Sequence, residues 1–248
     1  MKVSLIHMQI SESPEENLKT AEKMLYKAAD EDSKFICLPE YFPFPASVED
    51  RTRIESISEQ THGPAVNMLK RVSKDVDAYI VGGTVFEKFR GNYYNTCLFL
   101  KNGKILGKFH KMHLTDWEKR VGLHVGSTFK VFETEYCKVG ILICADVFYP
   151  RTVKSLASRG AEVIFLPVSA SRTHPHVKGH PLTTKRAEDN KVFFLKNGNT
   201  RSRSKGGNSA IISPWGLLSH AKDEINTKIV SADLNITKLR KFKRATAK

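Results

Sequence analysis

Short apolar runs alternate with segments of helical periodicity along the whole chain, and this alternation restricts the folds that the sequence can adopt. Patterns typical of strands occur at about 2–9, 34–39, 78–86, 93–100, 104–109, 129–132, 137–143, 162–168, 192–197, 208–213, 217–220 and 227–233. Helices are expected between them at 64–76, 150–159, 181–190 and 234–242, and from Ser13 onward. Hairpins mixed with strand-helix-strand units predict an α/β protein with two packed sheets covered by helices.

Local signals support this pattern at two places. Ser13-Pro14-Glu15-Glu16 is typical of a helix start, with an N-cap serine and a proline at the first helical position. Lys101-Asn102-Gly103-Lys104 lies between two apolar runs and predicts a hairpin turn. No linker or repeat divides the 248 residues, so we expect one domain over 1–248, with a basic tail from about 234.

The net charge of +14 raises the question of a nucleic-acid partner. Basic residues are scattered along the chain, with a local excess only at 201–205 and 238–244, and no nucleic-acid-binding motif accompanies them. We therefore expect a solvated basic surface and no nucleic acid. No apolar stretch approaches the roughly 20 residues that span a bilayer, and the N-terminus lacks a signal-peptide pattern, which predicts a cytoplasmic protein without a membrane partner.

The four cysteines have no CxxC spacing, so neither a disulfide framework nor a zinc site is indicated; they are Cys37, Cys97, Cys137 and Cys144. Cys144 follows the apolar run 139–143, a position suited to a nucleophile, although such a cysteine is more often a core residue. Glu40 closes the run 35–39 and Lys111 follows another strand-like run. Together they would supply a base, a cation and a nucleophile, but spacing alone does not bring them together.

The residues around each of these three positions indicate that they belong to one site. Leu38-Pro39-Glu40-Tyr41 resembles the glutamate motif of the nitrilase, or carbon-nitrogen hydrolase, superfamily, residues 108–114 resemble its lysine motif, and Ile143-Cys144-Ala145-Asp146 resembles its cysteine motif. The likeness continues through 160–167, 186–190 and 207–216, and so covers nearly the whole chain. The resemblance implies a four-layer αββα sandwich that forms a homodimer or a higher homo-oligomer.

The resemblance also implies the role of each residue. Glu40 would act as general base, Cys144 would form a thioester, and Lys111 with the backbone N–H of Ala145 would stabilise the oxyanion. Glu118 lies in a segment similar to the family's second-glutamate segment and would support catalysis, the alternative being a helix-surface acid. This chemistry requires no metal and no organic cofactor.

The substrate is less constrained than the chemistry, because Ala145 and Arg151 depart from the residues that the family often has there. We expect a small amide hydrolysed by water, with N-carbamoyl amides or nitriles as alternatives for the same triad. A different hypothesis is a low-activity binding or regulatory protein that engages an anionic partner.

Candidate substrate contacts are Tyr41, His113, Asp146, Arg172 and His174. Asp146 is equally suited to cap the helix that follows Cys144. The segment 171–180 contains three histidines but no nearby acidic or cysteine partner, so we expect a solvated or carboxylate-binding loop and no zinc site.

Overall fold

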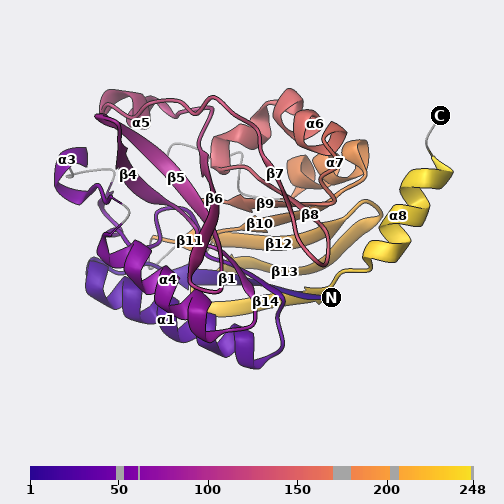
Figure 1. Cartoon of the computed structure of the whole chain (residues 1–248), viewed down its shortest axis with the longest axis horizontal. Helices are drawn as coiled ribbons and strands as arrows, with labels where there is room; N and C mark the ends of the chain where they lie inside the picture. Colours follow the sequence, from indigo (N-terminus) through magenta and orange to yellow (C-terminus); the bar gives the residue numbers. More distant parts are fainter. Residues whose placement is uncertain (49–52, 61, 170–179, 202–206, 247–248) are drawn as a thin grey trace.

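In a computed structural model of the chain, two β-sheets pack face to face between two layers of helices (Figure 1). The structure describes residues 1–48, 53–60, 62–169, 180–201 and 207–246. Helices α1 (Pro14–Asp30) and α4 (Pro64–Asp75) cover the outer face of the first sheet, and α6 (Pro150–Ser158) and α7 (Pro181–Asn190) cover that of the second. This arrangement confirms the predicted αββα sandwich.

The first sheet has the strand order β11-β1-β2-β3-β5-β4, with β14 paired to β1 and β6 paired to β5. Strands β1, β2 and β3 run parallel, so their carboxyl ends meet at one edge. The strands are β1 (Lys2–Gln9), β2 (Phe35–Cys37), β3 (Tyr79–Val81), β4 (Val85–Phe89), β5 (Asn92–Lys101), β6 (Lys104–His110), β11 (Asn199–Thr200) and β14 (Lys228–Asp233).

The second sheet has the order β13-β12-β10-β9-β8-β7. Its central strands β8, β9 and β10 are parallel, which again gathers carboxyl ends at one edge. The strands are β7 (Val131–Glu133), β8 (Lys138–Ile141), β9 (Val163–Pro167), β10 (Phe193–Asn197), β12 (Gly207–Ser213) and β13 (Gly216–Glu224). The loops that leave both sheets at these edges supply the site described below.

The predicted start and turn signals are confirmed. The Ser13 hydroxyl accepts the N–H of Glu16 at the start of α1, and Pro14 is the first residue of that helix. Asn102 and Gly103 join β5 to β6 with φ of 52° and 73°, the left-handed backbone that a two-residue hairpin turn needs.

The local structure differs from the sequence-based expectation at three points. The expected strand 78–86 is two strands, because the backbone turns at Gly83 with φ of 56°, where a side chain would collide with the carbonyl of Pro39. The helix α5 (Asp116–Arg120) was not expected, since five residues are too few to show periodicity. It is stabilised by a capping box between Thr115 and Glu118. The short helix α3 (Ile54–Ile57) was missed for the same reason.

The apolar core has two parts. One fills the space between the sheets, where the rings of Phe35 and Phe165 lie 6.0 Å apart, and the other lies between the first sheet and its helices, around Leu25 and Leu69. The core residues of both parts are almost completely buried. Close packing on both faces of the first sheet holds its strand ends in fixed positions.

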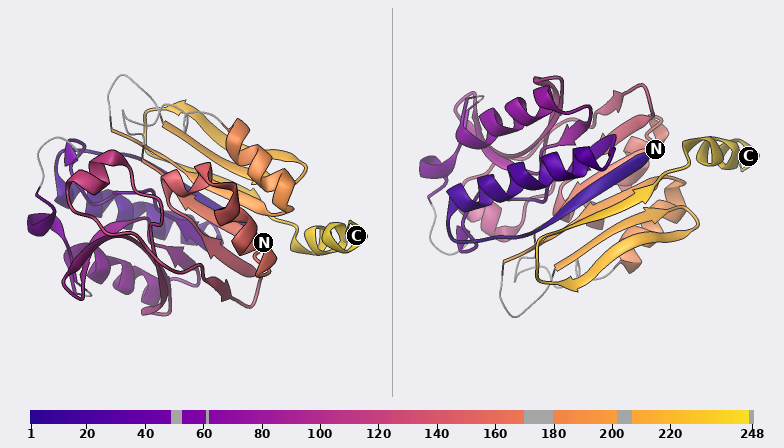
Figure 2. Two further views of the ribbon diagram at one scale, coloured as in Figure 1. Left: turned by 90° about the horizontal axis from the view of Figure 1, so that it is seen from above. Right: turned by 90° about the horizontal axis from the view of Figure 1, so that it is seen from below.

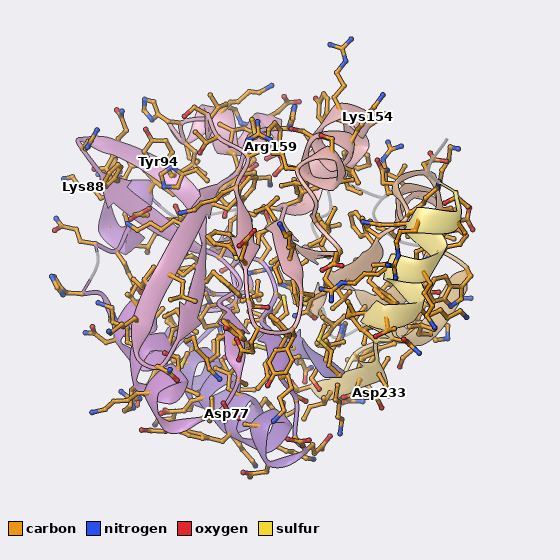
Figure 3. The ribbon with its side chains drawn as sticks, turned by 45° about the vertical axis from the view of Figure 1, so that its right-hand side comes forward. Asp77, Lys88, Tyr94, Lys154, Arg159 and Asp233 are labelled. Atoms are coloured by element: carbon orange, nitrogen blue, oxygen red, sulfur yellow. The ribbon has the colours of Figure 1, made fainter. Side chains whose placement is uncertain are left out.

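The predicted basic tail forms the helix α8 (Ile236–Ala245), which projects beyond the two sheets (Figure 2). Arg240 of this helix lies 2.6 Å from Glu162, which anchors it to the second sheet. Charged side chains such as Asp77, Lys154 and Asp233 are spread around the periphery (Figure 3). Among the described residues, none of the helices has the length and apolar character to cross a membrane.

Candidate active site

Glu40 and Lys111 meet at the edge where the strands end. Glu40 lies three residues beyond β2 and Lys111 directly follows β6, and each side chain is about 1% exposed. Lys111 Nζ lies 2.9 Å from Glu40 Oε1, and the N–H of Ser169, two residues beyond β9, donates to Glu40 Oε2 over 2.8 Å. Loops from both sheets thus hold one carboxylate.

Cys144 begins the 3₁₀ helix η1 (Cys144–Phe148) with a left-handed φ of 43°, a strained conformation that is common at functional sites. Its thiol is buried next to Glu40 and Lys111, the two groups whose charges act most strongly on it. Burial raises the pKa of Cys144 well above its usual value, and the charge of Glu40 adds to this, while Lys111 opposes it. The resting group is therefore the thiol, with a carboxylate in place to accept its proton.

Glu118 joins the same cluster from α5. Its Oε2 lies 2.9 Å from Lys111 Nζ and accepts the N–H of Thr115 over 2.8 Å, and its Oε1 accepts the hydroxyl of Tyr41. Burial alone would raise the pKa of Glu118, but the charge of Lys111 and these hydrogen bonds lower it. The side chain is fully buried, so it does not lie on the helix surface.

Lys111 remains an ammonium despite its burial. Burial would lower its pKa, but the charges of Glu118 and Glu40 raise it well above the usual value. Tyr41 also keeps its proton, because burial and the charges of the same two carboxylates raise the pKa of its hydroxyl well above 10. The site therefore holds a fixed cation and a fixed hydroxyl donor.

Asp146 links the cysteine segment to the lysine segment. Its Oδ1 accepts the N–H groups of Met112 and His113 over 3.2 and 2.9 Å, and its Oδ2 accepts the N–H of Ile143 over 3.0 Å. Because both oxygens are engaged and the side chain is fully buried, the structure favours the capping role over the predicted substrate contact. His113 also hydrogen-bonds Asp146 through Nδ1 and stacks on Tyr149, with ring centroids 3.6 Å apart.

The other predicted contacts divide into two groups. Tyr41 lies within the cluster, and Ala145 follows Cys144 in η1, so its N–H remains the predicted second oxyanion donor. Arg172 and His174 fall outside the described residues. Within the described part of the chain, no group of three or more His, Cys, Asp or Glu could hold a metal ion.

Sequence reasoning missed three side chains at or near the cluster. Asn95 of β5 is fully buried, and its Nδ2 reaches both Glu118 and Glu40. Arg186 of α7 donates to the carbonyls of Val147 and Phe148 over 3.0 and 3.2 Å, which fixes the end of η1.

The third missed side chain is Lys196 of β10, which is about 1% exposed. Burial lowers its pKa to about 8. The available signal for this residue and for Asn95 was a polar residue inside an apolar strand pattern, which does not identify a partner.

A buried thiol beside a carboxylate and an ammonium, at the carboxyl edge of an αββα sandwich, defines a hydrolase with a cysteine nucleophile. Residues 2–244 match the carbon-nitrogen hydrolase family, and the chain belongs to that family. The predicted recognition is therefore confirmed. So is the predicted enzyme class, a hydrolase acting on carbon-nitrogen bonds other than peptide bonds.

Relatives and solved structures agree with this assignment. The chain is 29% identical to the omega-amidase NIT2 of Homo sapiens, covering 96% of this chain and 90% of that protein. It is 30% identical to the omega-amidase NIT2 of Xenopus tropicalis, with coverages of 95% and 88%. The structure of Nit3 from Saccharomyces cerevisiae, a nitrilase-superfamily member, superposes with a TM-score of 0.88 at 26% identity, covering 99% of this chain and 94% of that one.

Proposed function

We propose that this protein hydrolyses small non-peptide amides through a thioester on Cys144. The observation that carries the proposal is the buried ion pair of Glu40 and Lys111, 2.9 Å apart, beside the buried thiol of Cys144. The omega-amidase relatives, which align over nearly the whole chain, support an amide as the substrate.

In the first half of the reaction, Glu40 takes the thiol proton while Sγ of Cys144 attacks the carbonyl carbon. The high pKa of the thiol makes this concerted base assistance necessary. The negative charge that forms on the carbonyl oxygen is stabilised by Lys111 and by the N–H of Ala145. Glu118 keeps the ammonium of Lys111 in place.

In the second half, Glu40 returns the proton to the departing nitrogen, so the C–N bond breaks and ammonia leaves. The acyl group is then held as a thioester on Cys144. Water attacks this thioester while Glu40 accepts one of its protons, and the carboxylic acid is released as the thiol is restored. Over the whole cycle, one amide and one water are consumed, and ammonia and the carboxylic acid are released.

Ammonia release from a substrate panel tests the proposal. The panel holds primary amides with and without a carboxylate elsewhere in the molecule, N-carbamoyl amides and nitriles. All three classes could be hydrolysed by Glu40, Lys111 and Cys144. We expect the amides to be turned over fastest, and Cys144→Ala to abolish turnover. Full activity of Cys144→Ala, or no turnover of any amide, contradicts the proposal.

We further propose a homodimer or a higher homo-oligomer and a cytoplasmic location, as expected from the sequence. Light scattering of the purified protein should give at least twice the chain mass, and fractionation of expressing cells should place the protein in the cytoplasmic fraction. A monomer or a membrane fraction contradicts the respective proposal.

A further inference from the structure

Asn95 contacts three buried side chains of the active site, namely Glu40, Tyr41 and Glu118. Its Nδ2 lies 2.8 Å from Glu118 Oε1, 3.0 Å from Glu40 Oε1 and 3.0 Å from Tyr41 Oη. Its backbone carbonyl accepts the N–H of Lys111 over 2.9 Å. One residue of β5 therefore meets both carboxylates and also fixes the backbone of the lysine between them.

The amide orientation is determined by its neighbours. Two carboxylate oxygens lie within hydrogen-bond distance of Nδ2, and the reversed amide would place Oδ1 of Asn95 against both of them. Within the described residues, Oδ1 is buried without a hydrogen-bond partner. An unsatisfied buried oxygen destabilises a fold, so the placement of Asn95 indicates a function for its N–H groups.

We propose that Asn95 is a positioning residue that donates to Glu40 and Glu118 at once, so that Glu40 remains aimed at Cys144 while Glu118 remains on Lys111. Two carboxylates around one ammonium repel each other, and the two Nδ2 protons give each a neutral donor in the space between them. A hydrogen bond to a carboxylate favours its charged form, so loss of these donors favours protonation within the cluster. The inference rests on the proposed hydrolysis for its role, and alkylation of Cys144 tests it without turnover.

The test compares Asn95→Ala and Asn95→Asp with the matched control Asn92→Asp on the same strand. Asn92 Nδ2 lies 3.5 Å from Tyr94 Oη, with no contact to the cluster, and its side chain is partly exposed. The readout is the acid limb of the pH profile for amide hydrolysis, together with kcat and KM. Circular dichroism and thermal unfolding establish which variants are folded.

We expect Asn95→Ala to move the acid limb upward by about one pH unit and to lower kcat with little change in KM. Asn95→Asp adds a third carboxylate to the cluster, so it should move the limb at least as far. Asn92→Asp should leave the limb unchanged. The proposal is overturned if folded Asn95→Ala keeps the wild-type limb, whether or not its activity falls, or if Asn92→Asp moves the limb equally.

A second readout does not depend on turnover. The rate at which iodoacetamide alkylates Cys144, followed by peptide mass at several pH values, also reports the proton acceptor beside the thiol. An upward shift in Asn95→Ala supports the role of Asn95 even if no amide is hydrolysed, in which case only the proposed function fails. If Asn95→Ala does not fold, Asn95→Asp carries the same comparison, and an unshifted alkylation profile in the folded variant overturns the proposal.

Discussion

Lys111 and Glu118 form a completely buried ion pair, with Nζ 2.9 Å from Oε2 and neither side chain more than 1% exposed. Glu118 also caps its own short helix through Thr115, so the position of the carboxylate is fixed by backbone structure. The ammonium that we assign to the oxyanion is thereby held by a second carboxylate in addition to Glu40. A buried charge that loses its partner is strongly destabilised, which makes this pair sensitive to substitution.

Glu118→Gln should lower kcat by about 100-fold, because a neutral amide no longer holds the ammonium of Lys111 at the oxyanion position. The matched control is Glu133→Gln at an exposed ion pair with Lys138, which should change kcat by less than twofold. Steady-state kinetics on the best amide of the panel measures both. Wild-type kcat in folded Glu118→Gln contradicts the assigned role of the pair.

Arg186→Met should impair both folding and activity, since the guanidinium of Arg186 holds the carbonyls of Val147 and Phe148 at the end of η1. Loss of two charge-assisted hydrogen bonds should reduce the free energy of unfolding by about 3 kcal/mol. Arg186→Lys should retain only part of this free energy, because an ammonium lacks the planar guanidinium that donates to both carbonyls at once. Lys185→Met, a neighbouring exposed position on the same helix, serves as control in urea titrations.

An Arg186→Met variant as stable as Lys185→Met would show that the guanidinium of Arg186 does not hold the segment that follows Cys144. Activity provides the second measurement. A small displacement of the nucleophile can lower kcat about 100-fold, so kcat should fall in the fraction that stays folded.

Lys196→Met should stabilise the protein at neutral pH. Burial lowers the pKa of Lys196 from 10.5 to about 8, so keeping it charged in the folded state costs on the order of 3 kcal/mol below pH 8. Between about pH 8 and 10.5 the folded protein has released a proton that the unfolded chain still binds, and wild-type stability therefore rises with pH in this window. The stability gap between Lys196→Met and wild type should narrow across it.

Chemical unfolding of both proteins at pH 7, 8, 9 and 10 measures this gap. Lys222→Met, on an exposed part of β13, is the matched control and should show a gap near zero throughout. A gap that stays constant with pH for Lys196→Met would mean that the ammonium is not the source of the difference.

The layers and most strands could be predicted because their apolar periodicity is local. Glu40, Lys111 and Cys144 were predictable as candidates since each follows an apolar run and stands in a recognisable motif. Their contact was not predictable from spacing, because it depends on how loops from two different sheets converge. The motifs supplied that information.

The remaining site residues depend on tertiary register. Asn95 reaches the carboxylates because β5 pairs with β6 in a register that places Thr96 opposite His110, one residue before Lys111. Glu118 is positioned by a five-residue helix whose only signal is its capping box. Neither relationship leaves a periodic trace in the sequence, so the role of Asn95 was missed and that of Glu118 rested on resemblance.

The most direct test of the central claim is the mass of the peptide that contains Cys144 after rapid acid quenching during amide turnover. We predict that this peptide gains the mass of the acyl group in the wild-type enzyme, that Glu40→Gln forms the adduct far more slowly, and that Cys144→Ala shows neither adduct nor ammonia release. Amide turnover by an enzyme in which the acyl group is carried elsewhere, or turnover that survives in Cys144→Ala, would contradict the account.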